Sequence, residues 1–147
     1  MLLISPSFEH EGTIPKKFTC DGGNINPELQ IQNVPAGARS LALIVHDPDA
    51  PMPGGFTHWV VWNINPATTL IKEESVPPGA MEGENDGGNI GYVGPCPPSG
   101  THHYHFRLFA LNDILDVPAD ASLEEIQTSI DNHTIEQAEL VGLYSRL

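Results

Sequence analysis

Three segments of the chain carry the apolar patterning of β-strands, and they lie at residues 41–47, 58–64 and 102–111. The first ends at Pro48, which cannot continue a strand ladder. Because strand side chains alternate between faces, Asp47, His58 and His102 each fall at the loop end of an apolar face. Their coincidence predicts a small polar pocket at one end of a β-sheet, a common kind of site for a small ligand.

The same alternation places His58 on one strand face with Val60 and Trp62. Helix signals are concentrated near the C-terminus. Residues 122–125 have a capping-box pattern and predict a short helix that ends near Asn132. Residues 134–137 repeat the pattern ahead of further apolar positions, so we expect a second helix there.

Composition favours a β-rich architecture in one domain spanning residues 1–147. The chain has 14 Gly and 14 Pro among its 147 residues, which is typical of short elements joined by tight turns. At this length a single core can bury most of the apolar surface. No linker-like stretch divides the sequence.

Charge excludes two classes of partner. The formal net charge is −13, with only six Lys and Arg. Such a chain would repel nucleic acid, and it would not adsorb to an anionic membrane. The first residues lack a basic region followed by a long apolar segment, so we expect neither a signal peptide nor membrane insertion and place the protein in the cytoplasm.

The two cysteines, Cys20 and Cys96, are too few for a disulfide framework or a metal cluster. In a reducing compartment free thiols are the default expectation. Each cysteine lies in a Gly- and Pro-rich loop, however, so they could be neighbours in the fold. A bridge therefore stays open at this point.

Separated motifs recur in an order that identifies a known family. They are Cys-Asp-Gly-Gly-Asn at 20–24, Asp-Pro-Asp-Ala-Pro at 47–51, the strand at 58–64, Gly-Pro-Cys-Pro-Pro at 94–98, and Ala-Glu-Leu-Val-Gly at 138–142. Together they resemble the phosphatidylethanolamine-binding, or Raf kinase inhibitor-like, proteins, in their bacterial and archaeal branch. The resemblance implies an antiparallel β-sandwich with Greek-key connections and short C-terminal helices. It also implies a pocket for phosphate or phosphorylated head groups.

Carried over to this chain, the resemblance gives a ligand-binding set: Asp47, His58, Gly94, Pro98, His102 and Tyr104, with Asp49 and Pro51 shaping the pocket wall. It further implies a cis peptide at Ala50–Pro51, which is reasonable because proline lowers the cost of the cis form. One departure is His103, where the family usually has Arg. Since His103 alternates outward, we expect the loss of a surface salt bridge.

The chemistry of these residues suits an anion. His58 and His102 can donate hydrogen bonds to phosphate oxygens, and loop amides around Gly94 can add donors. The negative charge of Asp47 is unfavourable next to an anion. Asp47 can instead orient a histidine, stabilise its protonated form, or bind the ammonium group of ethanolamine. A carboxylate and a bound phosphate would raise a histidine pKa, so binding should strengthen between about pH 8 and pH 6.

Other interpretations of the same residues stay open. The two aspartates could simply cap the turn. Asp47, His58 and Ser99 can be written as a catalytic triad, but Ser99 lacks the turn that exposes a nucleophile. His103 and His105 could chelate zinc, but they lack companion ligands at a recognisable spacing. We therefore predict no catalytic residue, no metal and no cofactor.

The sequence thus favours a binding module for a small phosphate-bearing ligand, with a regulatory or inhibitory role toward a protein partner. The alternative is an inhibitor of a serine protease or kinase that acts through its surface, and a slow hydrolase ranks below both. A homodimer is also expected, because the related branch is often dimeric and Trp59 or Trp62 could face outward from an exposed sheet.

Overall fold

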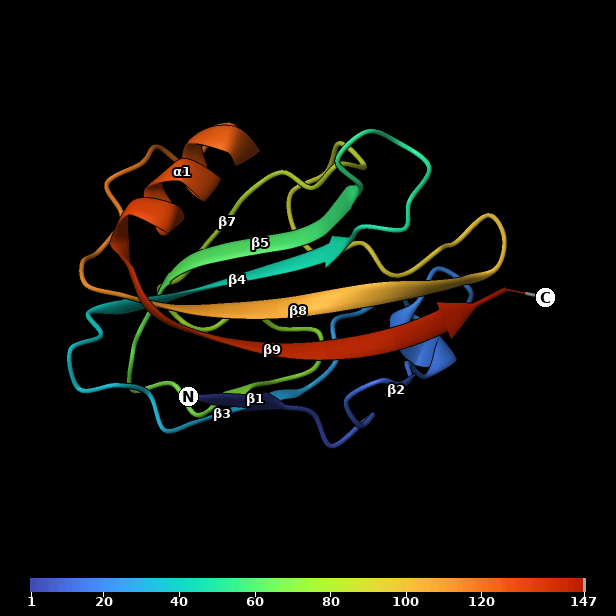
Figure 1. Cartoon of the computed structure of the whole chain (residues 1–147), viewed down its shortest axis with the longest axis horizontal. Helices are drawn as coiled ribbons and strands as arrows, with labels where there is room; N and C mark the ends of the chain where they lie inside the picture. The colour runs from blue at the N-terminus through green and yellow to red at the C-terminus, as the bar shows by residue number, and fades with distance from the viewer. Residues whose placement is uncertain (147) are drawn as a thin grey trace.

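The computed structural model describes residues 1–146 (Figure 1). Its elements in chain order are β1 (Leu2–Ile4), β2 (Gly12–Thr13), the 3-10 turn η1 (Lys16–Phe18), β3 (Leu29–Gln32), β4 (Ser40–Asp47), β5 (Phe56–Ile64), β6 (Leu70–Ile71), β7 (Met81–Glu82), β8 (Thr101–Leu111), α1 (Leu123–His133) and β9 (Thr134–Ser145). The three predicted strands are all present, so the expectation of a mainly β fold is confirmed.

The strands form a large and a small sheet. The large sheet has the order β2-β9-β8-β4-β5-β7, and the small one has the order β1-β3-β6. The short β2 runs parallel to β9, whereas the other pairings are antiparallel. The small sheet lies against one face of the large sheet and α1 lies against the other (Figure 1).

Two apolar cores follow from this layering. On β4, Leu41, Leu43 and Val45 pack toward the small sheet, while Ala42 and Ile44 pack toward α1. The strand is therefore buried on both faces, which explains its nearly continuous apolar sequence. Its position at the centre of the large sheet fixes where the loop after Asp47 emerges.

The expected second helix at residues 134–137 is wrong, because this segment is the start of β9. The strand pairs with β8 along its length, from Thr134 opposite Leu111 to Ser145 opposite Thr101. Ala138 and Leu140 pack into the core on one face, while Ile135 stays 45 % exposed. Long-range pairing with β8 outweighs the local capping signal.

The first helix is confirmed. The Ser122 hydroxyl accepts a hydrogen bond from the Glu125 backbone N–H at 3.1 Å, as a capping box requires, and the helix ends at His133. Ile126 and Ile130 bury its inner face. No helix within residues 1–146 is long and apolar enough to cross a membrane.

Two further expectations fail. No peptide bond within residues 1–146 is cis, so the implied cis bond at Ala50–Pro51 is not found. Trp59 and Trp62 are both fully buried, which removes the outward tryptophan as a reason for dimerisation. The homodimer itself stays a prediction.

Replacing Gly142 on β9 should destabilise the fold. A Cβ there would lie 2.4 Å from Cγ1 of Ile14 and 2.8 Å from Cε2 of Phe8, both buried side chains. We expect Gly142→Ala to lower the free energy of unfolding by about 1–3 kcal/mol through overpacking, measured by urea denaturation. Gly37→Ala is the control, because its Cβ would meet Ile135 at an ordinary 3.6 Å. Equal stability of the two variants would contradict this account of the packing around Gly142.

Candidate functional site

A cavity of about 210 Å³ lies between the loop after β4 and the loop before β8. Figure 1 shows both loops at the same end of the large sheet. The lining residues of the cavity are Asp47, Ala50, Pro51, Met52, Phe56, His58, Val93, Gly94, Cys96, Pro97, Pro98, His102 and Tyr104. The structure therefore brings together all six residues predicted to bind ligand, together with Pro51 of the predicted wall. Asp49 is the exception, since it does not line the cavity.

A β-bulge points His58 into this cavity. Val45 on β4 lies opposite Trp59, but the next residue, His46, lies opposite Thr57, so His58 is the extra residue. A bulge breaks strict alternation and re-aims the side chain. Simple alternation had placed His58 with Val60, which packs toward α1, so the predicted face was wrong, although His58 does line the cavity.

Asp47 and His102 form a buried pair. Nδ1 of His102 lies 2.6 Å from Oδ2 of Asp47, and the two residues are 7 % and 3 % exposed. Oδ1 of Asp47 accepts a second hydrogen bond from the backbone N–H of Asp49 at 2.8 Å. Asp47 thus caps the turn and orients a histidine at once. With Nδ1 engaged, Nε2 is the ring nitrogen of His102 left for a ligand.

His58 is held by the backbone instead of by Asp47. Its Nδ1 donates to the Val93 carbonyl oxygen at 2.7 Å, which again leaves Nε2 for a ligand. Burial lowers the pKa of His58 below its ordinary value. The expected upward shift is therefore wrong for this histidine in the free protein, and its imidazole is neutral at pH 7.

Tyr104 contributes a buried hydroxyl. The side chain is fully buried, and the hydroxyl has no hydrogen-bond partner among residues 1–146. Its ring lies edge-on to His58 and stacks beside His102, with ring centroids 5.2 Å and 6.3 Å away. Burial raises the pKa of Tyr104, so the hydroxyl keeps its proton and can donate.

Gly94 lines the cavity wall, and its amide is engaged within the protein. Its backbone N–H donates to Oδ1 of Asn24 at 2.7 Å, so this amide is already used, contrary to expectation. A Cβ at Gly94 would lie 2.5 Å from the Phe18 carbonyl oxygen. Glycine is therefore needed for close packing of the 94–98 loop.

Residues 4–145 match the phosphatidylethanolamine-binding protein family. The chain belongs to this family. A UPF0098 protein from Methanothermobacter thermautotrophicus is 46% identical over 99% of this chain and 99% of its own length. Among solved structures, the phosphatidylethanolamine-binding protein homologue CT736 from Chlamydia trachomatis superposes with a TM-score of 0.93 at 38% identity, over 99% of this chain and 97% of that one.

E. coli YbcL, described as a new member of the mammalian PEBP family, is a second structural neighbour. Its TM-score is 0.93 at 31% identity, over 99% of this chain and 98% of that one. The family assignment thus rests on sequence and on structure, and it agrees with the motifs in the sequence.

In this member of the family a disulfide closes one side of the cavity. Cys20 and Cys96 are bonded, which corrects the expectation of free thiols. The Cys20 N–H also donates to the Pro95 carbonyl oxygen at 3.1 Å. Since Cys96 lines the cavity, the bridge fastens the 94–98 wall to the loop around residue 20.

Asp49 and His103 form a contact outside the cavity. Oδ2 of Asp49 accepts from the His103 backbone N–H at 2.8 Å and from its Nδ1 at 2.7 Å. The side-chain hydrogen bond from His103 lowers the pKa of Asp49. The salt bridge expected to be lost with the family's usual Arg is thus replaced by a carboxylate–imidazole contact.

The arrangement does not assemble the alternative sites considered from sequence. Nδ1 of His105 lies 3.1 Å from Glu139, so His103 and His105 face different carboxylates. No group of three or more His, Cys, Asp or Glu side chains within residues 1–146 could hold a metal ion. Asp47 bonds His102 instead of His58, and Ser99 does not line the cavity.

Sequence reasoning missed two partners of His58. Phe56 packs against its ring with centroids 4.7 Å apart, and the Val93 carbonyl fixes its Nδ1. Phe56 comes two residues before His58, so extending the predicted strand backward would have included it. Nothing in the sequence marks a main-chain carbonyl that tertiary structure brings to a side chain.

Removing the disulfide should destabilise the protein and loosen the cavity wall. The bridge joins residues 76 positions apart, so its loss frees a long loop in the unfolded chain. We expect the double variant Cys20→Ser, Cys96→Ser to lose about 2–5 kcal/mol of unfolding free energy, measured by urea denaturation without reductant. Reduction of the parent protein is the control and should produce a similar loss. If both preparations kept the parent's stability, the bridge would not constrain this wall.

Proposed function

We propose that the cavity binds a small anion of the phosphate type, carried by a phosphorylated head group such as phosphoethanolamine. The observation that supports this most directly is the buried Tyr104 hydroxyl, which has no hydrogen-bond partner within the part of the chain that the structure describes. A buried donor left unpaired costs about 1–3 kcal/mol, and an acceptor on a ligand would remove that cost. The free Nε2 atoms of His58 and His102 line the same cavity.

Each polar group has a distinct part in this proposal. Tyr104 donates from a neutral hydroxyl at any physiological pH. His102 presents Nε2 with its opposite nitrogen held by Asp47, and both oxygens of Asp47 are occupied by hydrogen bonds. Asp47 therefore acts as a positioning residue for His102, not as the contact for a ligand ammonium.

The size and the remaining walls of the cavity favour a head group over a whole lipid. At about 210 Å³ the cavity is smaller than sites that enclose drug-sized ligands. Met52, Phe56, Pro97 and Pro98 supply apolar walls, which exclude water and strengthen hydrogen bonds to charge. The family name of the relatives, phosphatidylethanolamine-binding, is consistent with such a ligand.

A regulatory role toward a protein partner is the second part of the proposal. Met52 lines the cavity and is also 43 % exposed, so a bound ligand can alter the surface that this loop presents. A serine protease or a kinase is the partner class that the family resemblance implies. Inhibition that survives His102→Ala would instead indicate a surface that acts without the cavity.

Replacing Tyr104 tests the ligand site directly. We expect Tyr104→Phe to weaken sulfate and phosphoethanolamine binding about tenfold or more, because a hydrogen bond to a charged ligand is lost. Its stability should not fall, since the hydroxyl makes no hydrogen bond in the free protein. Calorimetry measures affinity, and urea denaturation measures stability.

Tyr92→Phe is the matched control for Tyr104→Phe. Its hydroxyl donates to the Phe18 carbonyl oxygen at 2.7 Å, and Tyr92 does not line the cavity. This variant should lose about 1 kcal/mol of stability and keep its affinity for anions. Unchanged affinity in Tyr104→Phe, or NMR shifts that leave Asp47, His58 and His102 unmoved, would refute the proposed site.

Sulfate affinity should change with pH at values below the ordinary pKa of histidine. Since Nδ1 of His58 already donates to Val93, Nε2 can donate to an anion only when the ring is protonated. The lowered pKa of His58 means that this protonation occurs as pH falls below about 6.5. We expect sulfate affinity to rise about five- to tenfold between pH 6.5 and pH 5, measured by calorimetry.

Sulfate keeps a constant charge over this range, so the profile reports the protein alone. His58→Gln is the control, because glutamine does not titrate, and it should remove the part of the rise that His58 carries. An identical profile in the parent and in His58→Gln would show that another group takes up the proton.

A further inference from the structure

The bulge at His58 is bonded to the connection between β7 and β8. In a regular strand, consecutive residues direct their main-chain groups to opposite edges. Here two consecutive residues both bond this one connection. The Thr57 carbonyl oxygen accepts from the backbone N–H of Asp86 at 2.9 Å, and the His58 carbonyl oxygen accepts from the backbone N–H of Val93 at 3.0 Å. The connection between β7 and β8 therefore holds the irregular part of β5 from outside the β4–β5 pair.

Asp86 makes a second contact with the bulge through its side chain. Its Oδ2 accepts from the Thr57 backbone N–H at 2.7 Å, so one residue bonds both main-chain groups of Thr57. A hydrogen bond to an ionised acceptor is roughly twice as strong as a neutral one. Since Thr57 is buried, loss of this carboxylate would leave its N–H without a partner from the protein.

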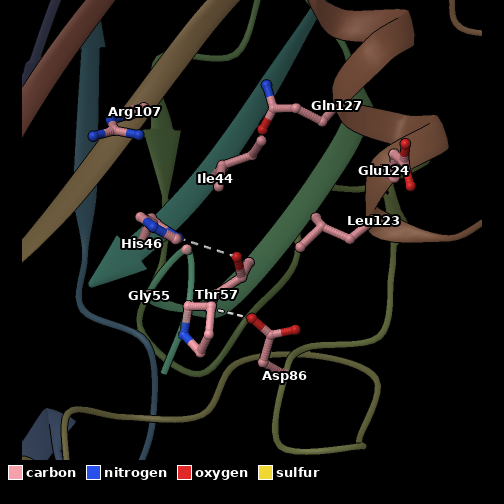
Figure 2. Close-up of a pocket in the computed structure, with 11 residues that line it drawn as sticks. Ile44, His46, Gly55, Thr57, Asp86, Arg107, Leu123, Glu124 and Gln127 are labelled. Carbon is pink, nitrogen blue, oxygen red and sulfur yellow. Dashed lines mark hydrogen bonds between the residues drawn. The ribbon is translucent and has the colours of Figure 1, made fainter. Parts of the chain in front are cut away.

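The Thr57 side chain is held on the α1 side of the sheet. Nδ1 of His46 on β4 lies 3.2 Å from the Thr57 hydroxyl. Figure 2 shows Thr57 between His46 and Asp86, with one contact to each, in a hollow of about 630 Å³ beside α1. None of these three residues lines the proposed anion cavity. Thr57 is thus fixed on one face of the sheet, while the next residue, His58, points into the cavity on the other.

The turn that presents Asp86 is closed by the residue before it. Asn85 is 4 % exposed, and its side-chain amide donates to the Gly91 carbonyl oxygen at 2.9 Å. Its Oδ1 accepts from the Gly87 backbone N–H at 2.8 Å. These two bonds tie the chain after Asp86 back to the chain before it. The carboxylate of Asp86 is therefore placed at the bulge by the fold of its own turn.

We propose that Asp86 is a positioning residue for His58: by binding the main chain of Thr57, it holds the bulge that turns His58 into the proposed anion cavity. The effect on ligand affinity rests on the proposed function. The orientation of His58, by contrast, can be measured without a ligand. Because Asp86 does not line the cavity, its replacement can act on a ligand only through His58 or through its charge.

Geometry and charge have opposite effects on anion binding, so they can be separated. Burial lowers the pKa of His58, and the carboxylates of Asp47 and Asp86 act against burial. The other titratable groups around His58 are His46 from β4, and Tyr104 and His102 from β8. At pH 7 the His58 imidazole is neutral, so the charge of Asp86 only repels an anion. Loss of that charge alone should not weaken anion binding at pH 7, whereas loss of the contact with Thr57 should weaken it.

Two replacements of Asp86 separate these effects, with sulfate affinity measured by calorimetry. Asp86→Asn keeps an oxygen acceptor for the Thr57 N–H, so affinity at pH 7 should stay within about twofold of the parent. Asp86→Ala removes the acceptor, and affinity should fall about fivefold or more because His58 loses its orientation. In Asp86→Asn the rise of affinity at acidic pH should move to lower pH, because a carboxylate that stabilises the imidazolium is gone.

NMR measures the orientation of His58 in the protein without ligand. In the parent, Nδ1 of His58 donates to the Val93 carbonyl oxygen, and the ring lies edge-on to Tyr104 with centroids 5.2 Å apart. Nitrogen-15 shifts report the Nδ1–H tautomer, and proton NOEs report the contact with Tyr104. We expect Asp86→Asn to keep both signals and Asp86→Ala to lose them. A parent protein that binds no sulfate would refute the proposed function, while these signals would still decide the role of Asp86.

Glu84→Ala is the matched control, because it removes the same charge from the same connection. Glu84 is exposed and lines neither hollow, so affinity and NMR signals should stay as in the parent. Parental His58 signals in Asp86→Ala would overturn the proposal, and so would equal losses in Asp86→Ala and Glu84→Ala. If Asp86→Ala does not fold, Asp86→Glu replaces it, since it keeps the charge and displaces the acceptor by one methylene. Parental signals in Asp86→Glu would likewise overturn the proposal, and their loss would support it.

Discussion

The central strand β4 is the constraint on which the cavity depends. It is hydrogen-bonded on one side to β5 and on the other to β8, and apolar side chains cover both of its faces. A strand so enclosed cannot slip by one residue, because a slip would exchange its two faces. Its end at Asp47 and Pro48 is therefore fixed, and so are the histidines on the neighbouring strands.

The bulge at His58 divides the polar residues at this end of the sheet between the two faces. With strict alternation, His58 would share a face with Val60 and point toward α1. The extra residue instead sends His58 toward Tyr104, while Thr57 stays on the α1 side and contacts His46. One backbone irregularity thus completes the cavity by adding His58 to its lining.

Sequence patterning identified residues that line one cavity because the key ones lie at the ends of strongly apolar strands. Asp47, His58 and His102 could be identified from local pattern alone, and the family motifs added Gly94, Pro98 and Tyr104. The predictions that were wrong have a common and different cause. The pairing of β9 with β8, the use of the Gly94 amide by Asn24 and the Cys20–Cys96 bond join segments far apart in sequence. Local propensity carries no information about such partners.

Electrostatics sets one more condition on the proposed anion site. A protein with a formal net charge of −13 repels anions at long range, so steering cannot draw them to the cavity. In the proposed anion site, affinity must therefore come from contacts inside the cavity. Asp47 is compatible with the proposed site because it positions His102, and its own charge is compensated by two hydrogen bonds. The carboxylate that looks unfavourable for an anion in the sequence is thus what keeps the His102 ring in position.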